Sequence, residues 1–286
     1  MTSPATVPVS TVIPCHDCAA TVGRALTSVL AQTRPSAELI LVDDGSTDGG
    51  ATRHRIHALR DDYRGPIRIK IIEHQANLGA AAARNSGWDA ATQTYLAFLD
   101  ADDAWDASKL EIQCAWMELH PSAAMSGHLH SLLREEEAGG VLARQVRPSE
   151  PGARRIAPRQ LLLSNVFATR TVMLRRELPF RFDPRFRRSD DFLLWLSIVH
   201  GGYEAWLLES VLAYSFKAAY GEGGLSRDLW AMEKSELAVY GQLARQGAIS
   251  ALSHRLLALY SLLKHVKRVA GRAFATSRSR SSFLRS

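Results

Sequence analysis

The sequence predicts an α/β fold in which helices cover a mostly parallel sheet. Two observations support this prediction. Over the first hundred residues, short apolar runs rich in Val, Ile and Leu alternate with longer segments of helical periodicity, and each apolar run ends in polar residues. With 286 residues, 46% of them hydrophobic, the chain can fill a sizeable core, so we expect an ordinary globular protein.

Four strands and three intervening helices are expected before residue 105. The strands are PVSTVIP at 8–14, ELILV at 38–42, IRIKII at 67–72 and YLAFL at 95–99. Apolar residues recur at helical spacing after the first strand, at Val22, Leu26, Val29 and Leu30. This stripe packs on the sheet, whereas Gly45 and the small polar residues after it predict a turn and a helix cap.

The pattern changes after residue 105. We expect a helix at 109–120, an extended segment at 126–133 and a loop or hairpin region at 134–159. A helix and then a strand should follow at 160–178, then a capped helix from Ser189 and an extended run at 205–216. A glycine-containing loop at 217–226 precedes a mainly helical region from Asp228 to about Phe274. The loop's glycines and Lys217 suggest a segment that closes over a bound ligand.

Acidic and other polar residues follow three of the predicted strands. Pro14–Asp17, Asp43–Thr47 and Asp100–Asp103 all lie where an apolar run ends. In open α/β sheets ligands bind outside the carboxyl ends of the strands, so we expect these three segments to line one crevice. Three aspartates within Asp100–Asp103 repel one another, and their oxygens suit Mg²⁺ or Mn²⁺. A solvated acidic turn is the alternative for this segment taken alone.

Three cysteines, Cys15, Cys18 and Cys114, are too few and too oddly numbered for a secreted disulfide framework. Cys15 and Cys18 follow a strand and begin a helix, which is where a thioredoxin-like redox pair would lie. Against this alternative, no aromatic residue precedes Cys15, and no second pair of ligands follows at zinc-finger spacing.

The N-terminus lacks a signal-peptide pattern, and no apolar run reaches the roughly 18–20 residues that span a bilayer. We therefore expect a cytoplasmic protein. The formal net charge is +6, and the segment from Lys264 to Ser286 contains many basic residues and no acidic ones. This basic C-terminus, including Lys267, Arg268 and Arg272, is a candidate for peripheral contact with the anionic inner face of the cell membrane; a solvated basic helix is the alternative.

Five segments, in their order and spacing, resemble the family 2 glycosyltransferases of GT-A fold. They are VSTVIPCHDCAATVGRALTSVLAQT, ELILVDDGSTDG, NLGAAAARNSGWDAA, YLAFLDADDAW and SDDFLLWL, and the resemblance covers roughly residues 7–217. It implies a Rossmann-like, nucleotide-binding mixed sheet flanked by helices. Residues 1–220 would form the GT-A domain, with a nucleotide-binding half at 1–105 and an acceptor half at 106–220. Residues 221–286 would hold a loop, C-terminal helices and the basic tail.

The resemblance also implies roles for residues at the donor site. Pro14 and His16 would border the base of the nucleotide, and Asp44 would form a hydrogen bond to it. Arg84 would approach the nucleotide, and Asp100 would face the ribose. Asp102, helped by Asp103, would hold a divalent metal, Mg²⁺ or Mn²⁺. The chain departs from the family at Cys15, His16 and Asp17, where a small residue, a tyrosine and an asparagine are usual. A histidine ring can replace the tyrosine, but the identity of the base is then less certain.

The acceptor side is implied by the segment Ser189-Asp190-Asp191, which matches the family's acidic pair before an aromatic-rich helix. Asp191 would be the catalytic base and Asp190 would contact substrate. Helix capping by a serine and two acids is the structural alternative. Asn165, Thr169 and Thr171 lie in the segment that would face the acceptor. Trp195, Trp206 and Tyr214 are candidates for carbohydrate stacking, although core packing is the favoured interpretation of these aromatic residues.

The function that the resemblance predicts is an inverting, metal-dependent transfer of a sugar from a nucleotide-diphosphate sugar, above all a UDP-sugar. The acceptor would be a saccharide or lipid-linked saccharide in cell-surface polysaccharide or lipopolysaccharide biosynthesis, with no nucleic-acid partner. Three alternatives belong to other classes: a degenerate sugar-nucleotide-binding module without catalysis, a CxxC redox protein, and a nucleotidyltransferase. The last commonly carries a basic, glycine-rich phosphate loop, which IPCHDCAATVG lacks.

Overall fold

The computed structural model describes residues 5–134, 151–216 and 228–283. The chain divides into two compact units, Met1–Lys217 and Ala218–Ser286. The expected closing loop at 217–226, with Lys217, Gly221, Gly223 and Gly224, lies outside the described residues, as does most of the expected loop region at 134–159. Each unit is described by itself.

The first unit is built on one mixed sheet. Its strands are β1 (Val7–Cys15), β2 (Ser36–Asp43), β3 (Arg68–Glu73), β4 (Tyr95–Phe98), β5 (Asp103–Trp105), β6 (Ala123–Leu132), β7 (Ala153–Arg155), β8 (Met173–Arg175) and β9 (Glu204–Ser215). The order is β3-β2-β1-β4-β8-β6-β9-β5, with β7 paired to β9. The first four strands pair in parallel, as predicted, and β8 joins them antiparallel to β4.

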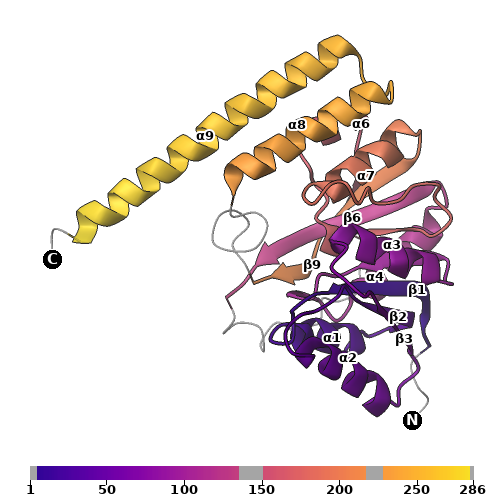
Figure 1. The fold of residues 1–286 in the computed structure, drawn as a ribbon. Helices are drawn as coiled ribbons and strands as arrows, with labels where there is room; N and C mark the ends of the chain where they lie inside the picture. Colours follow the sequence, from indigo (N-terminus) through magenta and orange to yellow (C-terminus); the bar gives the residue numbers. More distant parts are fainter. Residues whose placement is uncertain (1–4, 135–150, 217–227, 284–286) are drawn as a thin grey trace. The chain divides into compact units, whose positions relative to one another are not determined.

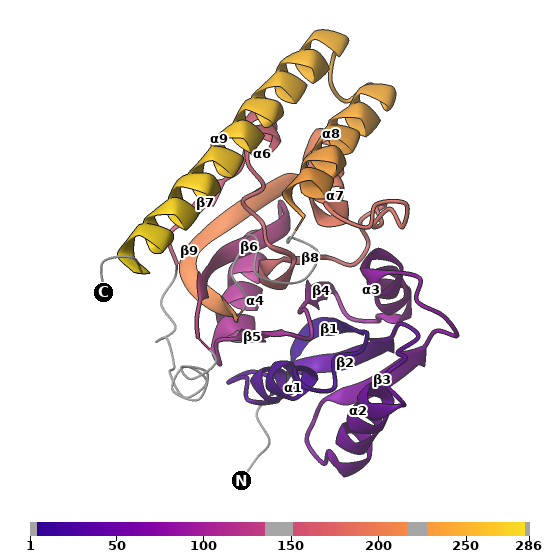
Figure 2. The same ribbon diagram turned by 60° about the vertical axis from the view of Figure 1, so that its left-hand side comes forward.

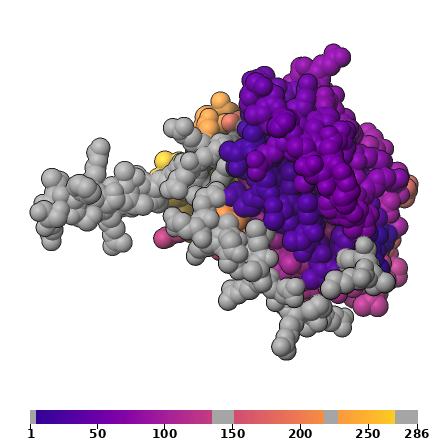
Figure 3. All heavy atoms as spheres, turned by 90° about the horizontal axis from the view of Figure 1, so that it is seen from below, coloured from indigo at the N-terminus to yellow at the C-terminus, as the bar shows by residue number. Residues whose placement is uncertain are grey.

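Helices cover both faces of the parallel part of the sheet. They are α1 (Val22–Leu30), α2 (Ala51–Asp62), α3 (Ala80–Ala90) and α4 (Lys109–Leu119), followed by α6 (Pro158–Leu163), the 3₁₀ turn η2 (Thr169–Thr171) and α7 (Asp190–His200). Helices α1 and α2 lie on one side of β1–β3 and α3 lies on the other (Figures 1 and 2). In the view from below, the coloured surface of this unit is formed mainly by its indigo and purple N-terminal residues (Figure 3).

The period-two pattern of β1 explains how the sheet is covered. Val9 and Ile13 point into the core that α1 and α4 close, whereas Val12 points to the opposite face and meets α3. There, a Cβ atom on Gly87 of α3 would lie 2.3 Å from the Val12 Cγ1 atom. Glycine at 87 therefore allows α3 to approach β1 closely.

A carboxylate is buried inside the sheet. Glu38 on β2 is fully buried and accepts hydrogen bonds from the Ser10 hydroxyl (2.6 Å), Arg68 (2.8 Å) and the Thr92 amide (3.0 Å), with Lys70 Nζ 2.7 Å away. Burial alone would raise the pKa of Glu38, but Lys70, Ser10 and Thr92 outweigh it and lower the pKa to about 2. Glu38 therefore joins β1, β2 and β3 and the turn before β4.

One short strand departs from the sequence prediction. The helix expected at 109–120 is confirmed as α4, but Asp103–Trp105, for which no strand was predicted, forms β5, antiparallel to β9. Asp103 pairs in register with Ser215, which lies more than a hundred residues away. A pairing of that kind depends on tertiary contacts and leaves no local sequence pattern.

The described part of the second unit, residues 228–283, contains two helices, α8 (Leu229–Arg245) and α9 (Ala251–Phe283), which lie side by side. The Asp228 side chain caps α8 by accepting hydrogen bonds from the amides of Trp230 and Ala231. Among the residues that the structure describes, no helix combines the length and the apolar character needed to cross a membrane.

Candidate active site

The ends of β1 and β2 lie together, as the sequence predicts. His16 Nδ1 is 3.0 Å from the Asp44 carbonyl oxygen, and the Asp17 carboxylate accepts hydrogen bonds from the Thr47 amide (2.6 Å) and hydroxyl (3.0 Å). Asp17 has a φ of 45°, a conformation that few residues other than glycine adopt. The bonds to Thr47 compensate for this strain and hold His16 beside β2.

Asp44 anchors the loop between β3 and α3. Its side chain is 2.7 Å from His74 Nδ1 and accepts hydrogen bonds from the amides of Leu78 (3.0 Å) and Gly79 (2.7 Å). A carboxylate offers about four acceptor sites, so these contacts occupy most of the Asp44 side chain. The implied hydrogen bond from Asp44 to a base therefore remains a prediction, which would use the remaining acceptor site.

Arg84 on α3 connects two segments that are far apart in the sequence. Its guanidinium donates to Asp100 (2.7 Å), after β4, and to Asp190 (3.0 Å), at the start of α7. Burial alone would lower the pKa of Arg84, but Asp100 and Asp190 outweigh it and raise the pKa, so Arg84 stays charged. The arginine predicted to approach a nucleotide thus also positions two of the predicted substrate-binding acids.

Asp191 is a partly buried carboxylate in a polar setting. It accepts hydrogen bonds from the Thr169 hydroxyl (3.1 Å) and from the Phe192 amide (2.7 Å). Burial, and then the neighbouring Asp190, raise the pKa of Asp191 to about 6. A carboxylate with a raised pKa is suited to accept a proton near neutral pH, which is the property required of a general base.

Capping does not account for Ser189. This residue has a φ of 57°, and among the described residues its side chain makes no hydrogen bond that caps α7. A left-handed serine is strained by roughly 1 kcal/mol or more. The serine part of the capping alternative is therefore wrong, whereas Asp190 and Asp191 do stand in the first turn of α7, where acidic side chains complement the helix dipole.

Two arginines contact the acidic turn between β4 and β5. Asp103 is buried and pairs with Arg170 (2.9 Å), and burial is the main reason that its pKa is raised to about 7. The backbone carbonyl of Asp102 accepts a hydrogen bond from Arg24 (2.6 Å), and Arg24 stacks over the Phe216 ring. Of the two predicted metal ligands, Asp103 is thus engaged by an arginine.

The carboxylates of this turn suit a divalent ion that also binds a diphosphate. Mg²⁺ at nucleotide sites is commonly held by only one or two carboxylates together with phosphate oxygens. Within residues 5–134, 151–216 and 228–283, no three His, Cys, Asp or Glu side chains form a ready cluster for a metal. Asp102 together with a substrate's phosphates is the donor set that fits, and Asp103 fits less well because of its pairing with Arg170.

The two cysteines at the end of β1 lie close to each other. Cys15 is buried and Cys18 is partly buried, and both are free thiols. The hydrogen bond between the two side chains raises the pKa of Cys15 and lowers that of Cys18. The Cys18 amide also bonds to the Thr52 hydroxyl (2.8 Å). The Cys18 backbone is therefore fixed to the first turn of α2, and the redox alternative stays a prediction to be tested.

The aromatic residues considered for carbohydrate stacking belong to the core. Trp195 is fully buried and donates to the Phe167 carbonyl (3.2 Å), and the Tyr214 hydroxyl donates to Asp106 (3.2 Å). Trp206 packs against Trp116 with ring centroids 5.6 Å apart. Thr169, in contrast, donates a hydrogen bond to Asp191, the predicted catalytic base.

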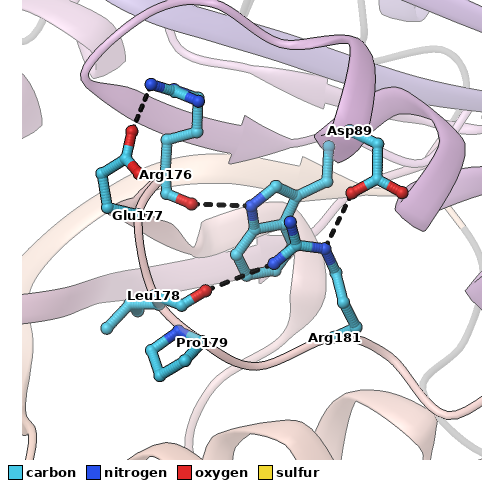
Figure 4. A pocket seen from close by; sticks show the side chains of 7 residues that line it. Asp89, Arg176, Glu177, Leu178, Pro179 and Arg181 are labelled. Carbon is cyan, nitrogen blue, oxygen red and sulfur yellow. Dashed lines mark hydrogen bonds and ion pairs between the residues drawn. The ribbon is translucent and has the colours of Figure 1, made fainter.

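A hollow of about 330 Å³ lies elsewhere, beside the C-terminal end of α3 (Figure 4). Its polar groups satisfy one another: Trp88 Nε1 donates to the Arg176 carbonyl (2.9 Å), and Arg181 pairs with Asp89 (2.9 Å) and lies 4.6 Å above the Trp88 ring. Because Arg84 lies nearer the opposite end of α3, the hollow is not the predicted site.

Sequence reasoning missed three side chains at the site. Arg24 contacts the Asp102 backbone, His74 contacts Asp44, and Arg170 pairs with Asp103. A signal was available for Arg24, which lies in the first turn of the helix that follows β1 and hence near the carboxyl edge of the sheet. Arg170 sits in a stretch with no comparable pattern, and only the fold brings it to Asp103.

Comparison with known proteins identifies the family. Residues 10–178 match the model of glycosyl transferase family 2. The chain belongs to this family. A relative from Escherichia coli, UDP-Glc:alpha-D-GlcNAc-diphosphoundecaprenol beta-1,3-glucosyltransferase WfgD, is 32% identical over 191 residues, or 67% of this chain and 69% of the relative. The amylovoran biosynthesis glycosyltransferase AmsB of Erwinia amylovora is 28% identical over 209 residues, 71% of this chain and 68% of the relative.

Solved structures confirm the predicted GT-A fold of this glycosyltransferase. Staphylococcus aureus TarS 1-349 in complex with UDP-GlcNAc superposes with a TM-score of 0.66 at 16% identity, covering 91% of this chain and 72% of the TarS 1-349 chain. The mannosyltransferase PcManGT from Pyrobaculum calidifontis, in complex with GDP-Man and Mn²⁺, gives a TM-score of 0.57 at 18% identity, covering 92% and 89%. At these identities the likeness concerns the fold alone.

Proposed function

We propose that this glycosyltransferase transfers a sugar from a UDP-sugar to a lipid-linked saccharide, with inversion, in the biosynthesis of a cell-surface polysaccharide. The names of two relatives support the substrate classes: WfgD uses UDP-Glc and a diphosphoundecaprenol-linked acceptor, and AmsB acts in amylovoran biosynthesis. The observation that supports the catalytic part of the proposal is Asp191, a partly buried carboxylate whose pKa is raised to about 6.

The donor would lie at the carboxyl edge of β1, β2 and β4. Pro14 and His16 would border the base, with Asp44 hydrogen-bonding it, and Asp100, held by Arg84, would face the ribose. Asp102 would hold a divalent ion against the diphosphate, where the ion would supply positive charge for the leaving nucleotide. His16 is suited to border a base because its ring is partly exposed while Nδ1 contacts the Asp44 backbone.

The transfer step would use one protein base. Asp191 would take the proton from the acceptor hydroxyl while the hydroxyl oxygen forms a bond to the anomeric carbon of the donor. The bond from that carbon to the diphosphate oxygen would break, and the electron pair would leave with the nucleoside diphosphate. A single displacement inverts the configuration at the anomeric carbon and needs one catalytic base. The Thr169 hydroxyl would orient that base, Asp191. Asp190, paired with Arg84, would contact substrate beside Asp191.

The donor site is tested by calorimetric titration with uridine, thymidine and guanosine diphosphates, each with Mn²⁺ and with a chelator. We expect UDP to bind, Mn²⁺ to strengthen binding, and Asp102→Ala to lose the Mn²⁺ dependence. Asp62→Ala, an exposed aspartate at the end of α2, is the matched control and should behave as the wild type. A preference for thymidine or guanosine diphosphate would overturn the UDP assignment. Absence of binding to all three nucleotides would overturn the proposed donor site.

Catalysis is tested separately from binding. The wild type, given a UDP-sugar and a mixture of lipid-linked saccharides, should release UDP. Asp191→Asn should bind UDP normally but release it about 10²–10⁴-fold more slowly. Release of UDP by Asp191→Asn at the wild-type rate would assign the base to another group. Binding of UDP without any acceptor-dependent release from the wild type would favour the degenerate binding module.

A further inference from the structure

The outward face of α9 carries an apolar stripe that is exposed in the described part of the chain. Leucine and valine recur at intervals of four and three residues, at Leu252, Leu256, Leu259, Leu263 and Val266. Each of these side chains is between 56% and 67% exposed. At 1.5 Å per residue the stripe runs about 21 Å along the helix. Scattered exposed leucines are common on proteins, but an aligned row of this length marks an interaction surface.

The opposite face of α9 is occupied by α8. Leu257 and Ser261 are buried there. Lys264 Nζ lies 2.7 Å from Glu236, and Arg268 donates to Glu233 at 3.0 Å. Two of the basic residues that the sequence offered for contact with an anionic membrane are thus committed to α8. The stripe faces away from α8, and the charges beside it must come from other residues.

Those charges are positive on both flanks of the stripe. Arg255 precedes Leu256 and Lys267 follows Val266, so at 3.6 residues per turn they fall on opposite sides of the apolar row, and both are exposed. The sequence of α9, Ala251–Phe283, contains no Asp or Glu. Pairing of this face with a second copy would bring like charges together along its edges, which disfavours a homodimer.

We propose that the outward face of α9 docks in the plane of an anionic lipid surface. The leucine row would enter the boundary between headgroups and acyl chains, and Arg255 and Lys267 would meet lipid phosphates. Helices that lie on membranes combine these two features, an apolar row and basic flanks with few acids. The inference goes beyond the transfer reaction and does not depend on it, because lipid binding is measured without donor or acceptor.

The test is co-sedimentation of the full chain with vesicles of phosphatidylcholine alone and of phosphatidylcholine mixed equally with phosphatidylglycerol. We expect binding to the anionic vesicles, weakened by salt, and little to the neutral ones. Leu256→Gln with Leu263→Gln should weaken binding by about tenfold or more. Lys267→Glu should weaken it by about tenfold, because it replaces an attractive charge with a repulsive one.

The matched control is Leu119→Gln, which removes a leucine of similar exposure at the end of α4 and should bind as the wild type. Glutamine favours helix, and circular dichroism confirms that each variant remains folded. The proposal is overturned if the wild type does not bind anionic vesicles, or if the leucine pair and Leu119→Gln behave alike. It is also overturned if sedimentation velocity shows a wild-type dimer that the leucine pair abolishes. Normal UDP binding by the leucine pair would separate this result from the proposed donor site.

Discussion

Arg84 on α3 donates a hydrogen bond of 3.0 Å to Asp190 on α7, 106 residues further along the chain. The same guanidinium holds Asp100 at 2.7 Å. One buried cation therefore connects the end of β4, where the donor would bind, with the turn that presents Asp191. This arrangement couples the positions of the predicted donor residues and the predicted base.

Replacement of Arg84 should damage both stability and transfer. Arg84→Ala leaves Asp100 and Asp190 without their shared cation, and breaking a buried ion pair costs on the order of 3–5 kcal/mol. Arg84→Lys keeps the charge but cannot form the planar two-sided contact, so kcat/KM should fall by about tenfold or more with a smaller loss of stability. Urea unfolding and initial rates measure the two effects.

Arg181→Lys is the control for Arg84, because Arg181 pairs with the exposed Asp89 near the other end of the same helix. It should change stability by less than about 1 kcal/mol and leave the rate unaltered. Equal losses for Arg84→Lys and Arg181→Lys would show that the bridge between Asp100 and Asp190 has no special importance.

The rate of transfer should depend on the ionisation of Asp191. A base must be deprotonated, and the pKa of Asp191 is raised to about 6, so log(kcat/KM) should rise with pH and level off above about 6. Asp191→Asn should lower kcat by about 10²–10⁴-fold. Asp89→Asn, an exposed aspartate on α3, should keep the wild-type profile. If the residual activity of Asp191→Asn falls at acidic pH in the same way as that of the wild type, the group that titrates is not Asp191.

The thiols at the end of β1 should be dispensable for transfer. Cys18→Ser keeps a small polar side chain beside Thr52, and we expect the rate to stay within about twofold to threefold of the wild type. Cys15→Ala, at the buried partner, should lower stability more than rate. Initial rates before and after treatment with dithiothreitol provide the comparison. Complete loss of activity in Cys18→Ser, with folding intact, would revive the redox interpretation.

Glu38 should contribute stability that depends on pH. Its pKa is lowered to about 2 in the folded protein, below the ordinary value of 4.5, so its stabilising effect is present above about pH 4.5 and is lost as the pH falls towards 2. Glu38→Gln should reduce the free energy of unfolding by about 2–4 kcal/mol at pH 7. The difference from the wild type should shrink across that acidic window.

Urea denaturation at a series of pH values measures the Glu38 effect, with Glu209→Gln as the control for an exposed glutamate on β9. The control should stay within about 0.5 kcal/mol of the wild type. A penalty for Glu38→Gln that is independent of pH would mean that shape, not charge, makes the buried carboxylate important.

Much of the N-terminal fold could be predicted because its signals are local. Each parallel strand is a short apolar run, and the three polar segments after β1, β2 and β4 identified the edge of the sheet where ligands bind. The segment with β5 was missed, because three residues that pair with β9 carry no pattern of their own. The burial of Glu38, the first residue of the run ELILV, was not predicted, since partners on β1 and β3 satisfy it only after the sheet forms.

The sequence by itself determined the order of strands and helices, the family, and the identity of the acids at the predicted site. Periodicity and motif spacing are properties of a few neighbouring residues, so they survive without coordinates. The tertiary structure decided which of these acids are engaged: Asp103 by Arg170, Asp100 and Asp190 by Arg84. It also turned Lys264 and Arg268 towards α8 and left the leucine row of α9 exposed. Such assignments depend on distances between segments far apart in the chain, and only folding sets those distances.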